Sequence, residues 1–319
     1  MIVALAGGVG GAKLADGLYR ALPPHSLTVV VNTADDFDLF GLRICPDADT
    51  VTYTLGGIAN PTTGWGIQGD TFETLEMLGR YGRDIWFRLG DRDFATHIMR
   101  TERLRAGATL SDVATEFSQA LGIQAAILPM ANESVASQVQ TPDGPLDFQE
   151  YFVHRHQSDA VTGVIFRGIE QARVTRQAAA ALVAARAVVF CPSNPIVSIG
   201  PILAVPELRE RIARLSVPKV AVSPIVGGRA LRGPADRMLE TLGHEVSAVG
   251  VAKLYQDILT GMVIDEVDAH LAPRIEALGL SVLVAPTIMV EPVDRQMLAQ
   301  RVLDFCGALS GRPTANRSE

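Results

Sequence analysis

The stretch MIVALAGGVGGAKLADGLYRALPPHSLTVVVNTADDFD, residues 1–38, decides the fold that we expect of this chain. Residues 1–6 are a short apolar run, and residues 7–11 form a glycine-rich turn. Leucines then repeat at helical spacing over 14–22, before a Pro-Pro pair that cannot continue a helix. Residues 27–31 are a continuous apolar run, typical of a strand buried on both faces of a parallel sheet. The stretch therefore predicts a βαβ unit.

The same rhythm returns in the second half of the chain and predicts a doubly wound α/β fold. We expect a mainly parallel, Rossmann-like sheet with a small helical insert. Buried strands are predicted at 187–191, 219–222 and 280–285, and helices near 176–186, 206–215, 235–242, 268–278 and 293–308. Alternating segments at 138–140, 148–153 and 161–166 predict added strands. The predicted parts are a core of 1–85 and 123–309, an insert of 86–122 with an amphipathic helix at 110–121, and a flexible tail of 310–319.

Composition narrows the class of protein before any motif is considered. The chain has 319 residues, of which 48% are hydrophobic and 20% are charged, so it is not intrinsically disordered. A formal net charge of -7 argues against a partner that is nucleic acid or an anionic membrane. There is no apolar run long enough to span a membrane, and the N-terminus lacks the basic leader of a signal peptide. We expect a cytoplasmic protein.

The glycine turn is a candidate phosphate site. Backbone N–H groups in a turn between a strand and a helix can approach a phosphate, and the helix dipole adds positive charge. Lys13 lies one turn into the helix and can add a full charge. The spacing matches neither the dinucleotide fingerprint nor the P-loop, and a tight turn that needs glycine only for its backbone angles is the simpler alternative. The predicted nucleotide-binding glycines are Gly7, Gly8, Gly10 and Gly11.

Aspartates follow the second predicted strand and are candidate metal ligands. Asp35 and Asp36 come directly after that strand, Asp47 comes eleven residues after Asp36, and Asp49 follows two residues later. Ligands of open α/β sheets bind at the carboxyl ends of the strands. Carboxylates there can hold Mg²⁺, which also takes oxygens from a bound diphosphate. The alternative is that Asp47 or Asp49 caps a helix that starts at Thr50.

Two further segments carry polar or aromatic groups. The block WFRLGDRDFATH, residues 86–97, offers Arg88 for an anionic group and Trp86 for a flat ring. For Arg100, Arg103 and Arg105, farther along, we expect an ion-paired helix surface, and for His97 a structural role. The loop PSNP follows the strand at 187–191 and again lies at the ligand edge of the sheet; its candidate residues are Ser193, Asn194 and Pro195. There is no Ser/His/Asp triad and no zinc signature.

Together these segments resemble the 2-phospho-L-lactate transferase family of deazaflavin coenzyme F-420 biosynthesis. The matching stretches run in order over nearly the whole chain. They are GGVGGAKL (7–14), VVVNTADDF (29–37), PDADTVTYTLGG (46–57), GWGIQGDTF (64–72), WFRLGDRDFATHIMRT (86–101), FQEYFV (148–153), PSNPIVSIGPIL (192–203) and AVSPIVGG (221–228).

The resemblance implies a phosphodiester-forming transfer that depends on Mg²⁺. Members take a phospho-hydroxyacid linked through a diphosphate to guanosine and move it to the ribityl hydroxyl of the deazaflavin FO, releasing GMP. The family's FO-binding Asp and Arg correspond to Asp49 and Arg88, and Asp49 would orient or deprotonate the hydroxyl. Asp35, Asp36 and Asp47 would hold the metal. We expect a homodimer whose small-molecule partners are FO and the guanylylated donor.

Departures from the family pattern and two alternative functions stay open at this point. The family's Pro-Met-Ser-Asp-Asp is replaced by Pro129-Met130-Ala131-Asn132-Glu133, and Asp38-Leu39-Phe40 stands where a Trp or His is common. The transferred acid can be phospholactate, phosphoenolpyruvate or 3-phosphoglycerate. The main alternative is a related nucleotide-sugar-binding regulator without transferase activity. A nicotinamide dehydrogenase is weakened by the missing G-x-G-x-x-G.

Overall fold

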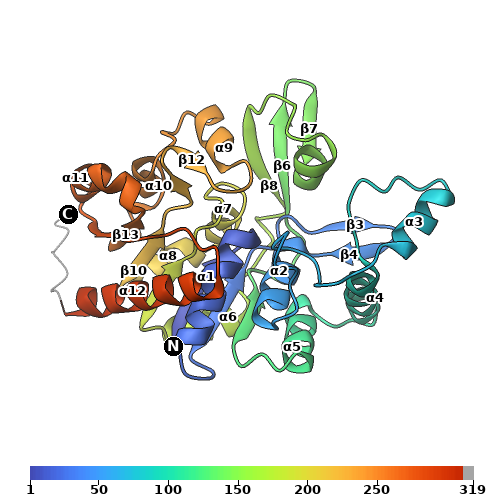
Figure 1. Ribbon diagram of the computed structural model, residues 1–319, viewed down its shortest axis with the longest axis horizontal. Helices are drawn as coiled ribbons and strands as arrows, with labels where there is room; N and C mark the ends of the chain where they lie inside the picture. Colours follow the sequence, from blue (N-terminus) through green and yellow to red (C-terminus); the bar gives the residue numbers. More distant parts are fainter. Residues whose placement is uncertain (312–319) are drawn as a thin grey trace.

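A seven-stranded parallel sheet forms the centre of the computed structural model, which describes residues 1–311 (Figure 1). Its strand order is β14-β13-β10-β9-β1-β2-β5, so the order reverses beside β1, as a doubly wound fold requires. The strands are β1 (Ile2–Ala6), β2 (Leu27–Val31), β5 (Ala126–Pro129), β9 (Ala187–Phe190), β10 (Lys219–Val222), β13 (Gly261–Ile264) and β14 (Ser281–Val284). The predicted fold class is confirmed.

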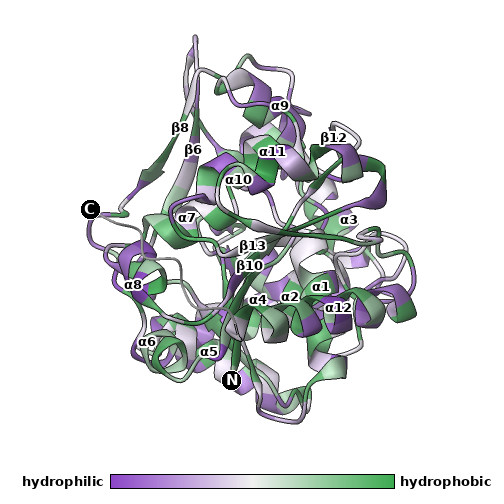
Figure 2. Cartoon of the chain, turned by 90° about the vertical axis from the view of Figure 1, so that its left-hand side faces the viewer, coloured by the Kyte–Doolittle hydropathy of each residue, from purple (hydrophilic) through white to green (hydrophobic). Residues whose placement is uncertain are grey.

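Helices cover both faces of this sheet because its strands are apolar on both sides. In β1, Ala4 and Ala6 belong to one apolar cluster, whereas Val3 and Leu5 belong to the other. The first face is covered by α1 (Gly8–Ala21), α2 (Pro46–Leu55) and α12 (Pro292–Ser310). The second is covered by α6 (Arg176–Val183), α7 (Ile199–Ala204), α8 (Leu208–Arg214), α9 (Ala235–Thr241), α10 (Ala248–Tyr255) and α11 (Ala272–Glu276). Figure 2 shows α1 and α12 together on one side, with α6 and α8 on the other.

The first and last helices are joined by close contacts. Gly17 of α1 lies so near the carbonyl oxygen of Arg295 in α12 that a Cβ at residue 17 would be 2.1 Å from it. The Arg295 guanidinium also pairs with buried Asp16, at 3.0 Å. Lys13 donates from Nζ to the carbonyl of Met289, which lies just before α12, at 2.6 Å. The face of α1 that contains Gly17 is therefore the surface on which α12, the last described helix, packs.

Two smaller parts flank the sheet. One contains the hairpin β3 (Phe37–Leu39) and β4 (Leu42–Ile44) with α3 (Glu73–Arg80), α4 (Asp91–Arg105) and α5 (Leu110–Ala120). The other is an antiparallel sheet of β7 (Gly144–Asp147), β6 (Ala136–Thr141) and β8 (Gly163–Arg167), with a π-helix, η1, at Glu150–His154. The short pair β11 (Ile225–Val226) and β12 (Arg229–Ala230) and the 3₁₀ helix η2 (Glu266–Leu271) complete the elements. An apolar cluster joins Ile44 to Leu75, Leu89 and Phe94, so the helical part packs on residues that precede 86.

Several sequence expectations on secondary structure are wrong. Residues 148–153 were predicted to be a strand, but most of them belong to η1. The helix predicted to start at Thr50 begins at Pro46, with proline in its first turn. Strand β13 and helix α10 were not predicted. Ser310 is the last residue of α12 rather than part of a tail, and the tail from 312 lies outside the described residues. Within residues 1–311, no helix has the length and apolar character needed to cross a bilayer.

Candidate active site

The glycine turn after β1 is built around a serine from β9's loop. Gly7 donates from its backbone N–H to Ser193 Oγ at 3.0 Å, and Ser193 Oγ donates to the Gly7 carbonyl at 2.8 Å. A Cβ on Gly10 would be 2.4 Å from the Pro192 carbonyl oxygen, and one on Gly11 would be 2.3 Å from Ser193 Oγ. The glycines therefore allow the start of α1 to lie against the loop that follows β9. These two strands flank the point where the strand order reverses.

Asp47 connects α2 to this turn. Its carboxylate accepts from the Gly8 N–H at 2.8 Å and from Asn32 Nδ2 at 2.9 Å. Gly8 has φ +61°, in the left-handed region that favours glycine. Asp47 therefore does not cap its own helix: it accepts from the first turn of α1 and leaves the rest of that N-terminus without a side-chain cap. Free N–H groups at a helix N-terminus favour an anion.

Asp35 and Asp36 are buried carboxylates with unpaired oxygens; Asp35 lies near Asp47, and Asp36 lies near Arg43. One oxygen of Asp35 and both oxygens of Asp36 have no hydrogen-bond partner among the described residues. Burial raises the pKa of Asp36 to about 7, against the lowering effect of Arg43, whose guanidinium is 3.8 Å away. Burial and then the neighbouring Asp47 raise the pKa of Asp35 well above its usual range. Such charges are costly to bury unless something neutralises them.

A divalent cation fits these oxygens, although they do not form a complete ligand cage. No group of three acidic, histidine or cysteine side chains in the described part of the chain is arranged to hold a metal ion. Mg²⁺ is commonly bound by one or two carboxylates together with waters and substrate phosphates. Asp35 and Asp36 offer unpaired oxygens of the kind that such a site uses, and Thr33 and Ser137 add buried hydroxyls that also lack a hydrogen-bond partner.

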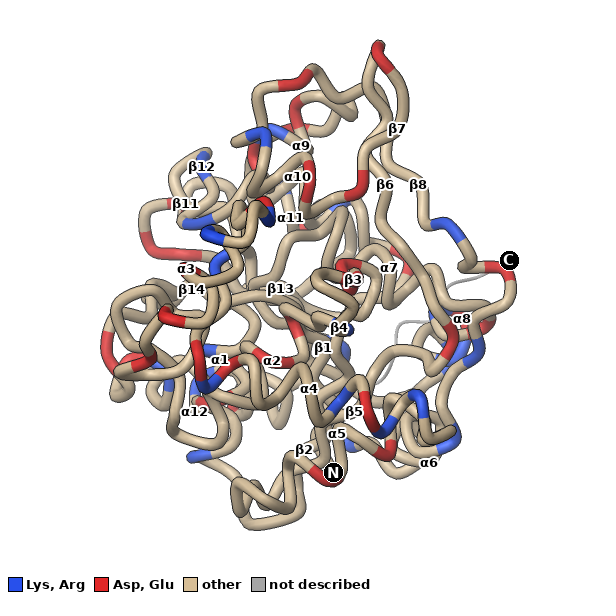
Figure 3. The backbone as a smooth tube through the Cα atoms, turned by 90° about the vertical axis from the view of Figure 1, so that its right-hand side faces the viewer, with Lys and Arg blue, Asp and Glu red and all other residues tan. Residues whose placement is uncertain are grey.

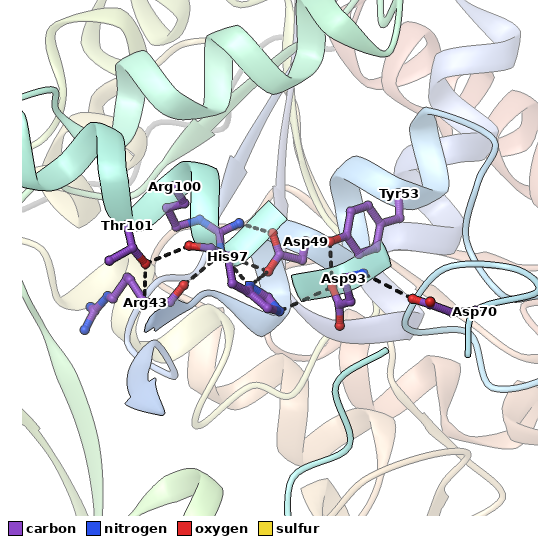
Figure 4. Close-up of polar contacts among 8 residues, drawn as sticks. All are labelled: Arg43, Asp49, Tyr53, Asp70, Asp93, His97, Arg100 and Thr101. Atoms are coloured by element: carbon purple, nitrogen blue, oxygen red, sulfur yellow. Dashed lines mark hydrogen bonds and ion pairs between the residues drawn. The ribbon is translucent and has the colours of Figure 1, made fainter. Parts of the chain in front are cut away.

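Asp49 lies in a buried charged network (Figure 4). Both of its carboxylate oxygens accept from the guanidinium of Arg100, one of them at 3.1 Å. His97 Nδ1 lies 3.7 Å from Asp49, and His97 Nε2 lies 3.3 Å from Asp93, which accepts from the Tyr53 hydroxyl at 2.6 Å. Asp49 is thus held by a charged pair, with His97 buried between two carboxylates. The network links α2 to α4, which Figure 3 shows beside one another.

The expectation that Arg100 is on an ion-paired helix surface is wrong. Its side chain is only 2% exposed, and it also donates to the carbonyl of Arg43 at 3.1 Å. Arg103 on the same helix does make a surface pair, with Glu116, and Arg105 donates to the Gly41 carbonyl. The partner of Arg100 lies 51 residues away in the sequence. The charges within α4 alone therefore do not predict that Arg100 pairs with Asp49.

Arg88 lines a cavity of about 400 Å³. Its guanidinium lies 4.2 Å from the ring centre of Phe72, which lines the same cavity. The other lining residues include Trp65, Asp70 and Asp93. Neither Asp49 nor Trp86 is among them, but Asp93, which lines the cavity, belongs to the same network as Asp49 through His97. The volume is within the range of small-molecule sites.

Other predicted site residues are already engaged. The Trp86 ring stacks on Phe37, with centroids 5.8 Å apart, and on His154, at 5.2 Å. Lys13 donates to the Met289 carbonyl, and its pKa is lowered by burial and then by the nearby Arg295 and Arg232. Asn194 Oδ1 accepts from two backbone N–H groups of its own loop, which also contains Pro195. These residues shape the site's surroundings, and Trp65 was missed by sequence reasoning.

Residues 131–133, which depart from the family pattern, make contacts with other parts of the fold. Asn132 Oδ1 accepts from both the N–H and the hydroxyl of Ser111 in the first turn of α5. Glu133 accepts from the Arg173 N–H at 3.0 Å, and Ala131 is buried in the core. The Asn and Glu side chains are thus committed to α5 and to the segment before α6.

Similarity to known proteins identifies the family of this chain. A family model described as 2-phospho-L-lactate transferase CofD matches residues 2–282. The chain belongs to this family. A phosphoenolpyruvate transferase of Streptomyces griseus is 43% identical over 310 residues, covering 95% of this chain and 98% of the relative. A 2-phospho-L-lactate transferase of Methanosarcina acetivorans is 40% identical over 302 residues, covering 95% and 98%.

A solved structure supports the fold of the family member described here. It is a UPF0052 family protein from Bacillus halodurans, with a TM-score of 0.64 and 15% identity, and the match covers 95% of this chain and 98% of that one. Likeness at this identity extends to the fold alone. The transferase role in coenzyme F-420 biosynthesis comes from the family and from relatives at 40% identity or more.

Proposed function

We propose that this family member moves a phospho-acid from a guanosine-diphosphate-linked donor to the terminal ribityl hydroxyl of FO and releases GMP. The hydroxyl oxygen would attack the phosphorus of the phospho-acid. A phosphodiester bond would form, the bond from that phosphorus to the GMP oxygen would break, and the hydroxyl proton would leave. The observation that carries the proposal is the α1 N-terminus, where Asp47 accepts from the Gly8 N–H alone of the backbone N–H groups and Gly7 provides no side-chain cap, beside buried carboxylates with unpaired oxygens.

The residues divide into a donor part and an acceptor part. The turn at Gly7–Gly11, braced by Ser193, supports a diphosphate at the α1 N-terminus. Asp35 and Asp36, with Asp47 near Asp35, would hold Mg²⁺, which would offset phosphate charge during the transfer. Arg88 and its cavity would hold FO.

Orientation is the role that we propose for Asp49. Both of its oxygens accept from Arg100, yet each carboxylate oxygen has a further lone pair that can accept from a substrate hydroxyl. Because both oxygens already accept from the Arg100 guanidinium, which fixes the position of the carboxylate, we favour orientation of the hydroxyl over the alternative base role.

The test is a transfer assay on the purified protein with Mg²⁺ and FO. Each of three guanylylated donors is supplied, carrying phosphoenolpyruvate, 2-phospholactate or 3-phosphoglycerate. Phosphoenolpyruvate is the acid that we propose first, because the Streptomyces relatives at 43–44% identity carry that name. We expect GMP and a phosphodiester of FO by mass spectrometry. No product from any donor would disprove the transferase proposal.

Changing Arg88→Ala is expected to weaken FO binding more than GDP binding. The guanidinium lines the cavity and lies over Phe72, so its loss removes a charged group from the wall of the acceptor part. We expect the KM for FO to rise roughly tenfold, as for the loss of one charged contact. Steady-state kinetics and GDP titration check this. Equal effects on both ligands would remove Arg88 from the acceptor site.

The buried carboxylates predict an unusual dependence of stability on pH. The pKa of Asp36 is raised to about 7 from 3.8, so the folded state binds more protons than the unfolded state between those values. Stability is therefore expected to fall as the pH rises from about 4 through 7. Mg²⁺ is expected to raise the melting temperature more at pH 8 than at pH 5, because ionised oxygens bind it better. Melting curves across this pH range, with and without Mg²⁺, measure both effects. A rise in stability over this range would contradict the account.

A further inference from the structure

The loop that carries Trp65 is braced on both sides of the tryptophan. Gly64 and Gly66 have φ of +78° and +72°, a left-handed conformation that glycine adopts without strain. The Asn60 N–H donates to the Gly66 carbonyl at 3.0 Å, and the Thr63 hydroxyl donates to the Trp65 carbonyl at 2.6 Å. Trp65 is therefore presented by a turn with its own hydrogen bonds.

Contacts from distant elements hold this loop beside the donor part. A Cβ on Gly64 would be 2.6 Å from the side chain of Val9, in the first turn of α1. Arg232, which follows β12, donates to the Thr63 carbonyl. The loop thus lies against the turn that we assign to the diphosphate. A ligand on the Trp65 side of the loop would be close to the transferred group.

The two tryptophans of the chain differ in what their rings already contact. Trp86 stacks on Phe37 and His154 and is not among the residues that line the cavity. Trp65 lines the cavity and is 41% exposed, and among the described residues it has no aromatic stacking partner. An exposed indole on a braced turn at the edge of a cavity is suited to stack on a flat ring.

The second wall of this cavity favours the same ligand chemistry. Phe72 and Arg88 form a cation–π pair that lines it, with a distance of 4.2 Å from the guanidinium carbon to the ring centre. The carboxylate of Asp70 is committed to the start of α4, where it accepts from the N–H groups of Arg92 and Asp93. The cavity thus presents two aromatic side chains and one cation to a ligand, together with Asp93 and the polar side chains of Asn60 and Thr63.

We propose that Trp65 is the stacking surface for the tricyclic ring of the acceptor, in the cavity lined by Phe72 and Arg88. Trp65 is then a binding residue that sets specificity for a flat aromatic acceptor, in place of the Trp86 predicted from sequence. The inference rests on the proposed function, because it takes FO as the ligand.

The test uses the full-length protein and FO itself. Trp65→Ala is expected to weaken FO binding roughly tenfold to a hundredfold, the range found when a stacking aromatic is removed. Trp65→Phe, which keeps a flat ring, should restore most of the affinity, and Trp86→Ala is the matched control on the other tryptophan. Binding is followed by the anisotropy of FO fluorescence. The KM for FO should rise with little change in kcat.

A second readout does not depend on activity. Because the chain has two tryptophans, Trp86→Phe leaves Trp65 as the sole indole and Trp65→Phe leaves Trp86. We expect FO to quench emission strongly in the first variant and weakly in the second. Unchanged FO affinity in Trp65→Ala, or quenching that follows Trp86, would overturn the inference while leaving the transferase proposal intact. A wild-type protein that neither binds nor modifies FO would overturn both.

Discussion

Replacing Arg100 with alanine is expected to destabilise the protein by about 3–5 kcal/mol, the usual cost of leaving one partner of a buried ion pair alone. The Asp49 carboxylate would keep its buried position but lose the two hydrogen bonds from the guanidinium. His97, which lies between Asp49 and Asp93, cannot replace a bidentate partner. Urea unfolding followed by circular dichroism measures the change in the free energy of unfolding.

Arg103→Ala is the matched control, because it removes the same side chain from the same helix. Its ion pair with Glu116 is at the surface, where such pairs contribute little, so we expect almost no change in the urea midpoint. A double replacement, Arg100→Met with Asp49→Leu, should recover much of the lost stability, because no buried charge remains. If Arg100→Ala and Arg103→Ala had the same urea midpoint, the buried pair would not contribute to the stability of the fold.

Changing Asp36→Asn is expected to lower transfer by roughly 10²–10³-fold, the cost of removing one electrostatic group from an active site. The stability of the unliganded protein at pH 8 should not fall with it. The variant removes a buried charge whose carboxylate oxygens have no hydrogen-bond partner among the described residues. The fall in stability with rising pH should become shallower, and the effect of Mg²⁺ on the melting temperature should shrink.

Asp38→Asn provides the control for this variant. Asp38 lies two residues away and shares the partner Arg43, at 3.6 Å, but its side chain is 73% exposed. We expect Asp38→Asn to leave turnover, the pH profile and the Mg²⁺ effect nearly unchanged. Parallel transfer assays and melting curves on Asp36→Asn and Asp38→Asn test whether the effect is specific to Asp36. If both lost activity equally, the effect would belong to Arg43 rather than to the buried carboxylate.

The sequence predicted the parts of the fold whose residues carry their own signal. Residues 27–31 (LTVVV) and 219–222 (KVAV) are mainly apolar and rich in valine, and both are strands with those bounds. Helix α10 was missed because it contains Gly250 and two valines, which are poor helix formers. Packing requires glycine at position 250, because a Cβ there would be 1.8 Å from the Glu245 carbonyl oxygen. No local pattern conveys a requirement of that kind.

The candidate site was predictable where strand ends could be recognised. The glycine turn, Asp47 and Ser193 all follow strands or lie near them, and the structure joins them by hydrogen bonds. Arg100 was placed at the surface because its partner is distant in sequence. Trp65 was overlooked because its role depends on a loop folding back toward α1. Tertiary partners of this kind cannot be inferred from one sequence and spacing rules alone.

The packing of α1 against α12 has a consequence for how the protein is made. The helix that would bind the donor is synthesised well before its partner, Pro292–Ser310, because Asp16 and Arg295 are 279 residues apart in the sequence. Until that partner arrives, the small surface around Gly17 stays uncovered and Asp16 lacks its ion pair with Arg295. The donor site is therefore expected to mature late in synthesis, so that chains truncated before residue 292 should not bind nucleotide.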